Sequence, residues 1–270
     1  MVDQFAQASA GVKVAAVFAA WVAVWLPIAI PLAITLQWRP LKPLTVEQKL
    51  PLVASLYAIA PLILWGAAYL EHRPFSDYGL AWNWMLLAFT ALGISLGVVG
   101  IAALFGLQQV FGWITWQQEH LAQFKTALFP TLLLGLWVSV TEELVFRGFL
   151  LNQLQDEYPL WIAAGFSSLI FALLHLVWEG RETVPQLPGL WLMGMVLVLA
   201  RWANGGDLGL AIGLHAGWIW GIASLDTAQM IQSRNCGPVW MTGVANQPLA
   251  GAMGLLLLLI TGGVVWAIGL

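Results

Sequence analysis

TEELVFR, residues 141–147, interrupts a long apolar run with Glu142, Glu143 and Arg147. On either side, residues 128–140 and 148–151 contain no charged side chain. Each ionisable group near the centre of a bilayer costs roughly 2.5 to 3.5 kcal/mol. Only 9% of the chain is charged, so these three residues are costly exceptions. They predict a functional site inside a membrane-spanning helix.

The overall composition indicates a polytopic membrane protein. Hydrophobic residues make up 60% of the 270 residues, whereas soluble domains are nearer roughly 45 to 50% apolar. The apolar runs are continuous rather than alternating, which favours helices over the strands of a membrane barrel. We therefore predict an all-α, polytopic transmembrane helical bundle. The lipid bilayer is the expected partner, and the net charge of −3 gives no indication of nucleic acid.

Apolar runs of roughly 20 residues predict about eight spans. Residues 1–11 carry no positive charge, so we expect the first run to be a permanent span rather than a cleaved signal. The sixth and seventh runs are short, and Asn204-Gly205-Gly206-Asp207 predicts a tight turn between them. We see no internal repeat and predict one membrane domain over residues 1–270. The runs are residues 13–36, 51–70, 84–105, 128–151, 160–177, 190–203, 208–225 and 249–270.

Two connections between these runs are long enough to have structure of their own. Residues 108–125 mix aromatic and polar side chains at helical spacing, which predicts an amphipathic helix at the membrane interface. Residues 226–247 form the longest loop and are expected to fold over one mouth of the bundle.

The two adjacent acids are predicted to have different roles. Neighbouring helical residues point about 100° apart, so Glu142 and Glu143 cannot share a face. Glu143 and Arg147 are four residues apart, in the favourable order for an ion pair. Glu142 has Phe146 at that spacing and no cation on its own face, so we expect it to be the more basic carboxylate and the general base for a water. The alternative is a buried structural cluster that braces the helices.

Two histidines in predicted spans extend the candidate site. His175 ends the fifth run, and His215 lies within the seventh. Neutral imidazoles bind metals, or hydrogen-bond a water and a developing oxyanion. Glu142, His175 and His215 match the ligand set of a catalytic zinc, but the HExxH motif is absent. The sequence thus permits zinc and equally permits a site without a metal. The structural alternative is that each histidine is a hydrogen-bonded core residue.

The positions of these residues along their helices constrain the packing. At about 1.5 Å per residue, Glu142 lies roughly 20 Å from the start of its run. His175 is close to the end of its own, so the helices must tilt or the fifth must extend past Val177. Small residues around His215, such as Gly213 and Gly217, allow close helix approach, and we expect them to serve packing rather than substrate binding.

The order of these motifs resembles the CPBP family, the CAAX-prenyl and bacteriocin-processing intramembrane proteases, also called the abortive-infection family. The resemblance covers residues 128–225, the predicted protease-like core. It implies an intramembrane endopeptidase in which Glu142 activates water, His175 helps to orient it and His215 stabilises the oxyanion or shares in activation. The matching residues are Glu142, Glu143 and Arg147 for Glu-Glu-x-x-x-Arg, Phe171 and His175 for Phe-x-x-x-His, and His215 for the later histidine.

The resemblance also implies a substrate class and a location. The substrate would be a membrane peptide or protein, such as a prenylated C-terminus or a leader peptide. The protein would be a multi-pass protein of a bacterial plasma membrane or a related internal membrane. The family has been described both as zinc metalloproteases and as metal-independent glutamate proteases, so zinc and no cofactor both stay open.

One position departs from the family pattern. The family usually has Asn four residues after the last histidine, where this chain has Ile219. If that amide helps to hold the oxyanion, this chain is a slow enzyme or takes the donor from elsewhere, either from a backbone N–H near the Gly-rich stretch or from a hydroxyl such as Ser167 or Ser168. Ile219 also favours a non-catalytic scaffold or assembly factor of the same fold. A proton-coupled transporter is the third alternative, although we see no inverted repeat.

Overall fold

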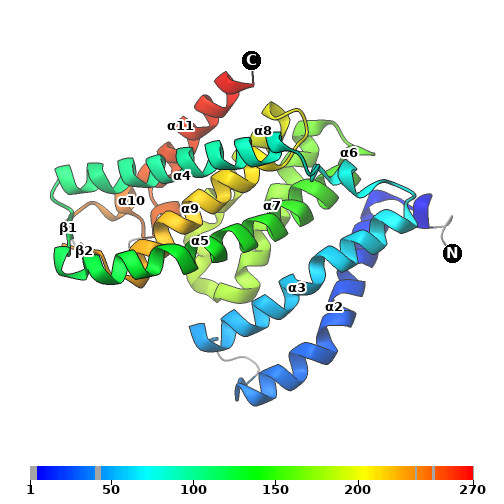
Figure 1. Cartoon of the computed structure of the whole chain (residues 1–270), viewed down its shortest axis with the longest axis horizontal. Helices are drawn as coiled ribbons and strands as arrows, with labels where there is room; N and C mark the ends of the chain where they lie inside the picture. Colours follow the sequence, from blue (N-terminus) through cyan, green and yellow to red (C-terminus); the bar gives the residue numbers. More distant parts are fainter. Residues whose placement is uncertain (1–4, 40–43, 235, 245–246, 270) are drawn as a thin grey trace.

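The computed structural model describes residues 5–39, 44–234, 236–244 and 247–269. Helices dominate this part of the chain (Figure 1), and its strands are the short β1 and β2, so the predicted all-α class is confirmed. The helices are α2 (Ala10–Thr35), α3 (Val46–Leu70), α4 (Trp84–Val110), α5 (Leu121–Glu143), α6 (Leu151–Gln155), α7 (Leu160–Glu179), α8 (Leu187–Ala203), α9 (Gly209–Thr227), α10 (Val239–Thr242) and α11 (Ala252–Ile268).

Each of the eight predicted runs coincides with a helix, but the count of eight spans is not confirmed. Among the described residues, five segments are long and apolar enough to cross a membrane: Ala10–Thr35, Glu47–Leu70, Trp84–Val110, Gln118–Gln155 and Leu160–Ala203. The last comprises α7 and α8, which pack against each other around a 3-10 turn. The helix α9 is not among the five, α11 is shorter, and residue 270 lies outside the described residues. The chain is a multi-pass integral membrane protein.

The central helix is α9, which packs between α4 and α5 (Figure 1). Glycines permit this close approach. A Cβ atom at Gly213 would lie 2.2 Å from the carbonyl oxygen of Thr90, and one at Gly217 would lie 2.6 Å from that of Ile94. Any larger residue would push α4 away from α9. The glycines around His215 therefore serve helix packing, as expected.

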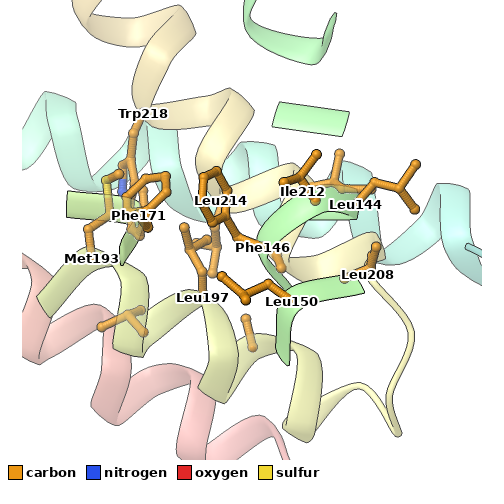
Figure 2. Close-up of a cluster of buried hydrophobic side chains, with 14 of the residues drawn as sticks. Leu144, Phe146, Leu150, Phe171, Met193, Leu197, Leu208, Ile212, Leu214 and Trp218 are labelled. Carbon is orange, nitrogen blue, oxygen red and sulfur yellow. The ribbon is translucent and has the colours of Figure 1, made fainter. Parts of the chain in front are cut away.

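An apolar core lies where α7, α8 and α9 meet η3, the π-helical segment Leu144–Leu150 (Figure 2). Phe146 of η3 packs edge-on against Phe171 of α7, with ring centroids 5.1 Å apart. Leu197 of α8 and Leu214 of α9 belong to the same buried cluster. This packing fixes the ring of Phe171 and the helical turn that contains His215.

The hairpin of α2 and α3 lies to one side of the other helices (Figure 1). Two indole N–H groups of α2 bind α3: Trp21 Nε1 donates to the Leu56 carbonyl at 3.0 Å, and Trp25 Nε1 donates to Ser55 Oγ at 2.9 Å. The hairpin is joined to α6 through Glu71, which pairs with Lys13 and accepts a hydrogen bond from Gln153.

The predicted amphipathic helix over residues 108–125 is wrong. The chain leaves α4 at Val110, turns at Gly112 with φ 72°, and forms β1 (Ile114–Trp116) and a 3-10 turn before α5. The strand β1 pairs antiparallel with β2 (Ile231–Ser233), which lies in the loop after α9. A left-handed glycine ends a helix readily, and Ile-Thr-Trp favours a strand. The expected cover over residues 226–247 is described only in part, because residues 235, 245 and 246 lie outside the described residues.

Candidate active site

The acidic motif lies where α5 changes into the π-helical segment η3. Such widened turns occur frequently at functional sites. Arg201 of α8 supports this segment, because its guanidinium donates to the carbonyl of Arg147 and, at 2.8 Å, to Asn152 Oδ1. Arg201 also donates to the carbonyl of Gly206 at 3.0 Å, which ties the tight turn after α8 to η3. Arg201 was not among the predicted site residues, because its place near the end of a predicted helix was the only signal in the sequence.

The predicted ion pair between Glu143 and Arg147 is confirmed. Arg147 Nη1 lies 3.1 Å from Glu143 Oε1, and both side chains are fully buried. The guanidinium carbon of Arg147 lies 4.4 Å from the centre of the Phe171 ring, a cation–π contact. Phe171 of the apolar core therefore contacts the buried charge directly.

His215 is oriented by the same carboxylate. Its Nδ1 lies 2.8 Å from Glu143 Oε1. A carboxylate that is paired with Arg147 only accepts hydrogen bonds, so Nδ1 carries the proton and Nε2 keeps a free lone pair. That Nε2 faces Glu142 Oε2 at 3.7 Å. Glu143 thus joins the buried cation to the histidine, a link that the sequence analysis did not predict.

Glu142 has a second neighbour that the sequence analysis also missed. The hydroxyl of Tyr57, on α3, donates a hydrogen bond to Glu142 Oε1. Glu142 is buried, so the absence of a cation on its own helix face does not leave it without partners. The second predicted span contains both Tyr57 and Tyr69, and nothing in the sequence distinguishes the one that reaches the site.

The ring of Phe171 lies between His175 and His215. His175 Nδ1 donates to the carbonyl of Phe171 at 2.8 Å, within its own helix. Its ring centroid lies 4.7 Å from that of Phe171, which in turn lies 6.1 Å from that of His215. Among the residues that the structure describes, no hydrogen bond or ion pair joins His175 to Glu142. The fifth predicted span does extend past Val177, because α7 ends at Glu179.

The expected zinc ligands are not gathered in this structure. Within the described ranges, no group of three His, Cys, Asp or Glu side chains is placed to hold a metal ion. Glu142 and His215 are neighbours, but His175 is engaged with a backbone carbonyl of its own helix. Among the described residues, this arrangement does not fit a three-ligand zinc site.

Zinc dependence stays a prediction with a direct test. If zinc is required, elemental analysis of the purified protein should give about one ion per chain, as expected for one site with three protein ligands. The variants His175→Ala and His215→Ala should then each lose the ion. An active preparation that contains no metal and is unaffected by chelators would exclude the zinc hypothesis.

The hydroxyls expected to replace the missing Asn are not directed at Glu142. Ser167 Oγ donates to the carbonyl of Phe146 at 3.0 Å. Ser168 faces α8, since a Cβ atom at Gly194 would lie 2.6 Å from its Cβ. Ile219 lies in the interface of α5 and α9, with its Cβ 3.6 Å from a Cβ built at Gly135. It thus occupies the same interface as His215, one turn further along α9.

Residues 124–221 match the family model described as type II CAAX prenyl endopeptidase Rce1-like. Comparisons with curated proteins and with solved structures gave no match. The matched region contains every residue of the candidate site that the sequence analysis named, whereas α2 and α3, with Tyr57, precede it. The family match agrees with the motif order and with the apolar helices. The core of this chain, residues 124–221, is therefore similar to the type II CAAX prenyl endopeptidase Rce1-like family, which supports the predicted resemblance to the CAAX protease (CPBP) family.

Proposed function

We propose that this protein is an intramembrane endopeptidase in which Glu142 and His215 together activate a water molecule. The family match supports intramembrane CAAX-type endopeptidase function in general. The observation that carries the residue assignment is the 3.7 Å separation of Glu142 Oε2 and His215 Nε2, two buried acceptors on different helices.

The chemistry follows from the hydrogen-bonding capacity of these two atoms. An ionised carboxylate and the bare nitrogen of a neutral imidazole both accept hydrogen bonds, so they are satisfied by a donor that they share. A water that gives one hydrogen to each keeps its lone pairs free to attack a carbonyl carbon. Glu142 then takes a proton from the attacking water and returns it to the leaving amine as the C–N bond breaks.

Glu143 and Arg147 would act through His215. The carboxylate of Glu143 fixes the Nδ1–H tautomer, which keeps Nε2 available to the water. Arg147 pairs with Glu143 at a fully buried position, with Nη1 3.1 Å from Oε1. The arrangement follows the general logic of an active residue oriented by a second and third group. In this scheme His175 acts through Phe171 on the shape of the site.

The substrate class that we propose is a membrane-associated peptide with a prenylated C-terminus, in a bacterial plasma membrane or a related internal membrane. Purified protein in liposomes should be given two peptides that share the same sequence around the expected cleavage site, one with a prenylated C-terminus and one with an apolar leader segment. We expect cleavage at one defined bond of the prenylated peptide, measured by mass spectrometry. Preferential cleavage of the leader peptide would redirect the assignment to leader processing.

A non-catalytic scaffold is the second candidate, and Ile219 is the observation that favours it. An apolar side chain stands where the family usually presents an amide donor. Under this hypothesis neither peptide would be cleaved by folded protein, whereas a membrane partner would still co-purify with it. Turnover of either peptide by the wild type excludes the scaffold.

A further inference from the structure

We propose that Tyr57 is a catalytic residue whose hydroxyl donates a hydrogen bond to the tetrahedral oxyanion. Ile219, whose side chain has no donor, cannot make this hydrogen bond. The inference rests on the proposed function, because it concerns the same hydrolytic site. It assigns a role to a helix outside the matched region of residues 124–221.

The Tyr57 hydroxyl lies directly at the carboxylate of Glu142. It donates to Glu142 Oε1, while His215 Nε2 faces the other oxygen, Oε2, of the same carboxylate. The phenol and the imidazole therefore stand at the two oxygens of the general base. When a water held at Oε2 attacks a carbonyl carbon of the substrate, the carbonyl oxygen lies within a few ångströms of the Glu142 carboxylate. A hydroxyl at that carboxylate is then close enough to hydrogen-bond the carbonyl oxygen. The phenol is the neutral O–H group already present there.

The two hydroxyls that the sequence indicated as replacements for the missing Asn are not directed at Glu142. The hydroxyl of Ser167 is bonded to a backbone carbonyl, and Ser168 faces α8. The indole N–H of Trp218 is buried without a hydrogen-bond partner, but its side chain belongs to the apolar cluster with Phe171 and Met193 (Figure 2). Trp218 is therefore the competing donor that an experiment has to test.

The helix α2 holds α3 in place directly before Tyr57. The two residues directly before Tyr57 are the acceptors of the indole hydrogen bonds from α2: Ser55 binds Trp25, and Leu56 binds Trp21. A donor aimed at a transition state must be fixed before the reaction, because it then costs no reorganisation at the moment of reaction. The α2–α3 hairpin provides that support for one hydroxyl.

The catalytic cycle explains how one hydroxyl can serve two acceptors in turn. In the resting site the O–H of Tyr57 binds the ionised Glu142. When the water attacks, its proton moves to Glu142, a new C–O bond forms, and the carbonyl π electrons move to the oxygen. Glu142 is then neutral and a weaker acceptor, so the phenol O–H turns to the oxyanion, the stronger charged acceptor. As the C–N bond breaks, Glu142 protonates the amine, and Tyr57 returns; the phenol keeps its own proton throughout.

The test compares Tyr57→Phe with Tyr69→Phe, which makes the same change at an exposed position of the same helix. Losing one oxyanion donor costs about 100- to 1000-fold in kcat. We therefore expect Tyr57→Phe to lower kcat by about that factor, with KM nearly unchanged, and Tyr69→Phe to change neither. The proposal is overturned if Tyr57→Phe changes only KM, or if its kcat stays within about threefold of wild type. It is also overturned if Trp218→Phe loses much of its kcat while Tyr57→Phe is as active as the wild type.

A rescue experiment separates catalysis from structure. Ile219→Asn should restore much of the lost rate in the Tyr57→Phe background and change the wild-type rate far less, because the two donors then serve one oxyanion. Equal effects of Ile219→Asn in both backgrounds contradict a shared acceptor. If Tyr57→Phe does not fold, fluorinated tyrosine at position 57 keeps the hydroxyl, and an unchanged kcat across the fluorinated series contradicts the role. A folded wild type that cleaves nothing overturns the proposed function and this inference with it, whereas an active wild type with an unaffected Tyr57→Phe overturns only the role of Tyr57.

Discussion

Glu142→Gln is expected to lower peptide cleavage by about 1000-fold or more, while the protein folds and melts as the wild type does. Glutamine keeps the shape of the side chain, and its amide oxygen still accepts the hydrogen bond from Tyr57. It cannot take a proton from the water, however. General acid–base catalysis by a positioned group contributes about 100- to 10,000-fold, and Glu142 would act twice, as base and then as acid. The measurement is the initial rate at which the prenylated peptide is cleaved in liposomes, monitored by mass spectrometry.

The matched control for this prediction is Glu182→Gln, which neutralises an exposed carboxylate on the 3-10 turn between α7 and α8. Its rate and its apparent melting temperature in detergent should equal those of the wild type. An active Glu142→Gln, with a rate similar to that of Glu182→Gln, would mean that another group activates the water. A Glu142→Gln that is inactive because it melts far earlier would support the bracing role of the acidic cluster instead.

The helices were predictable because continuous hydrophobicity is a local property of the sequence. The seventh run, residues 208–225, became α9, Gly209–Thr227, and the turn before it has Gly205 and Gly206 at positive φ, as the sequence indicated. The number of membrane crossings does not follow from the same signal. The helix α9 is buried by α4 and α5, so its residues are chosen for close packing as much as for contact with lipid.

In the candidate site, too, contacts within one helix were predictable from the sequence, whereas contacts between helices were not. The pair of Glu143 and Arg147 was predictable, because residues four apart on one helix must meet. The contacts of His215 with Glu143 and of Tyr57 with Glu142 join residues 72 and 85 positions apart, and they depend on how helices pack. The hydropathy of a span carries no information about which of its polar groups will face another helix. The place of His215 in a predicted span and the motif order of the resemblance both indicated His215, whereas nothing in the sequence indicated Tyr57.

The amphipathic helix predicted before α5 failed for a related reason. Aromatic and polar residues at helical spacing also fit a strand when a partner is available. Here the partner of Ile114 is Ser233, which lies beyond α9 in the sequence. Gly112 ends the preceding helix at a positive φ that other residues rarely adopt. The local pattern was real, but a distant strand decided the structure.

Glu143→Gln is expected to destabilise the folded protein more than any other single neutralisation in the site. Arg147 is fully buried, and Glu143 is its only ion-pair partner among the described residues. Breaking a buried pair by removing one partner costs about 3 to 5 kcal/mol, because the remaining charge is left uncompensated. Glutamine keeps an amide oxygen that still accepts from His215 Nδ1, so the change isolates the loss of charge from the loss of the histidine contact.

The decisive measurement is a double-mutant cycle in free energy of unfolding with Glu143→Gln, Arg147→Met and the combination of the two. The double variant should be more stable than either single variant, because neutralising both partners leaves no buried charge, and replacing a whole buried pair by neutral groups is often nearly neutral. Glu142→Gln serves as the control in the same assay, since no arginine or lysine pairs with Glu142 in the part of the chain that the structure describes. Equal destabilisation by Glu142→Gln and Glu143→Gln, or strictly additive losses in the double variant, would contradict the division of the two acids into a chemical and a bracing residue. Strong coupling between Glu143→Gln and Arg147→Met in the free energy of unfolding, together with a Glu142→Gln variant that is stable but inactive, is the result expected if Glu142 does the chemistry and Glu143 braces the fold.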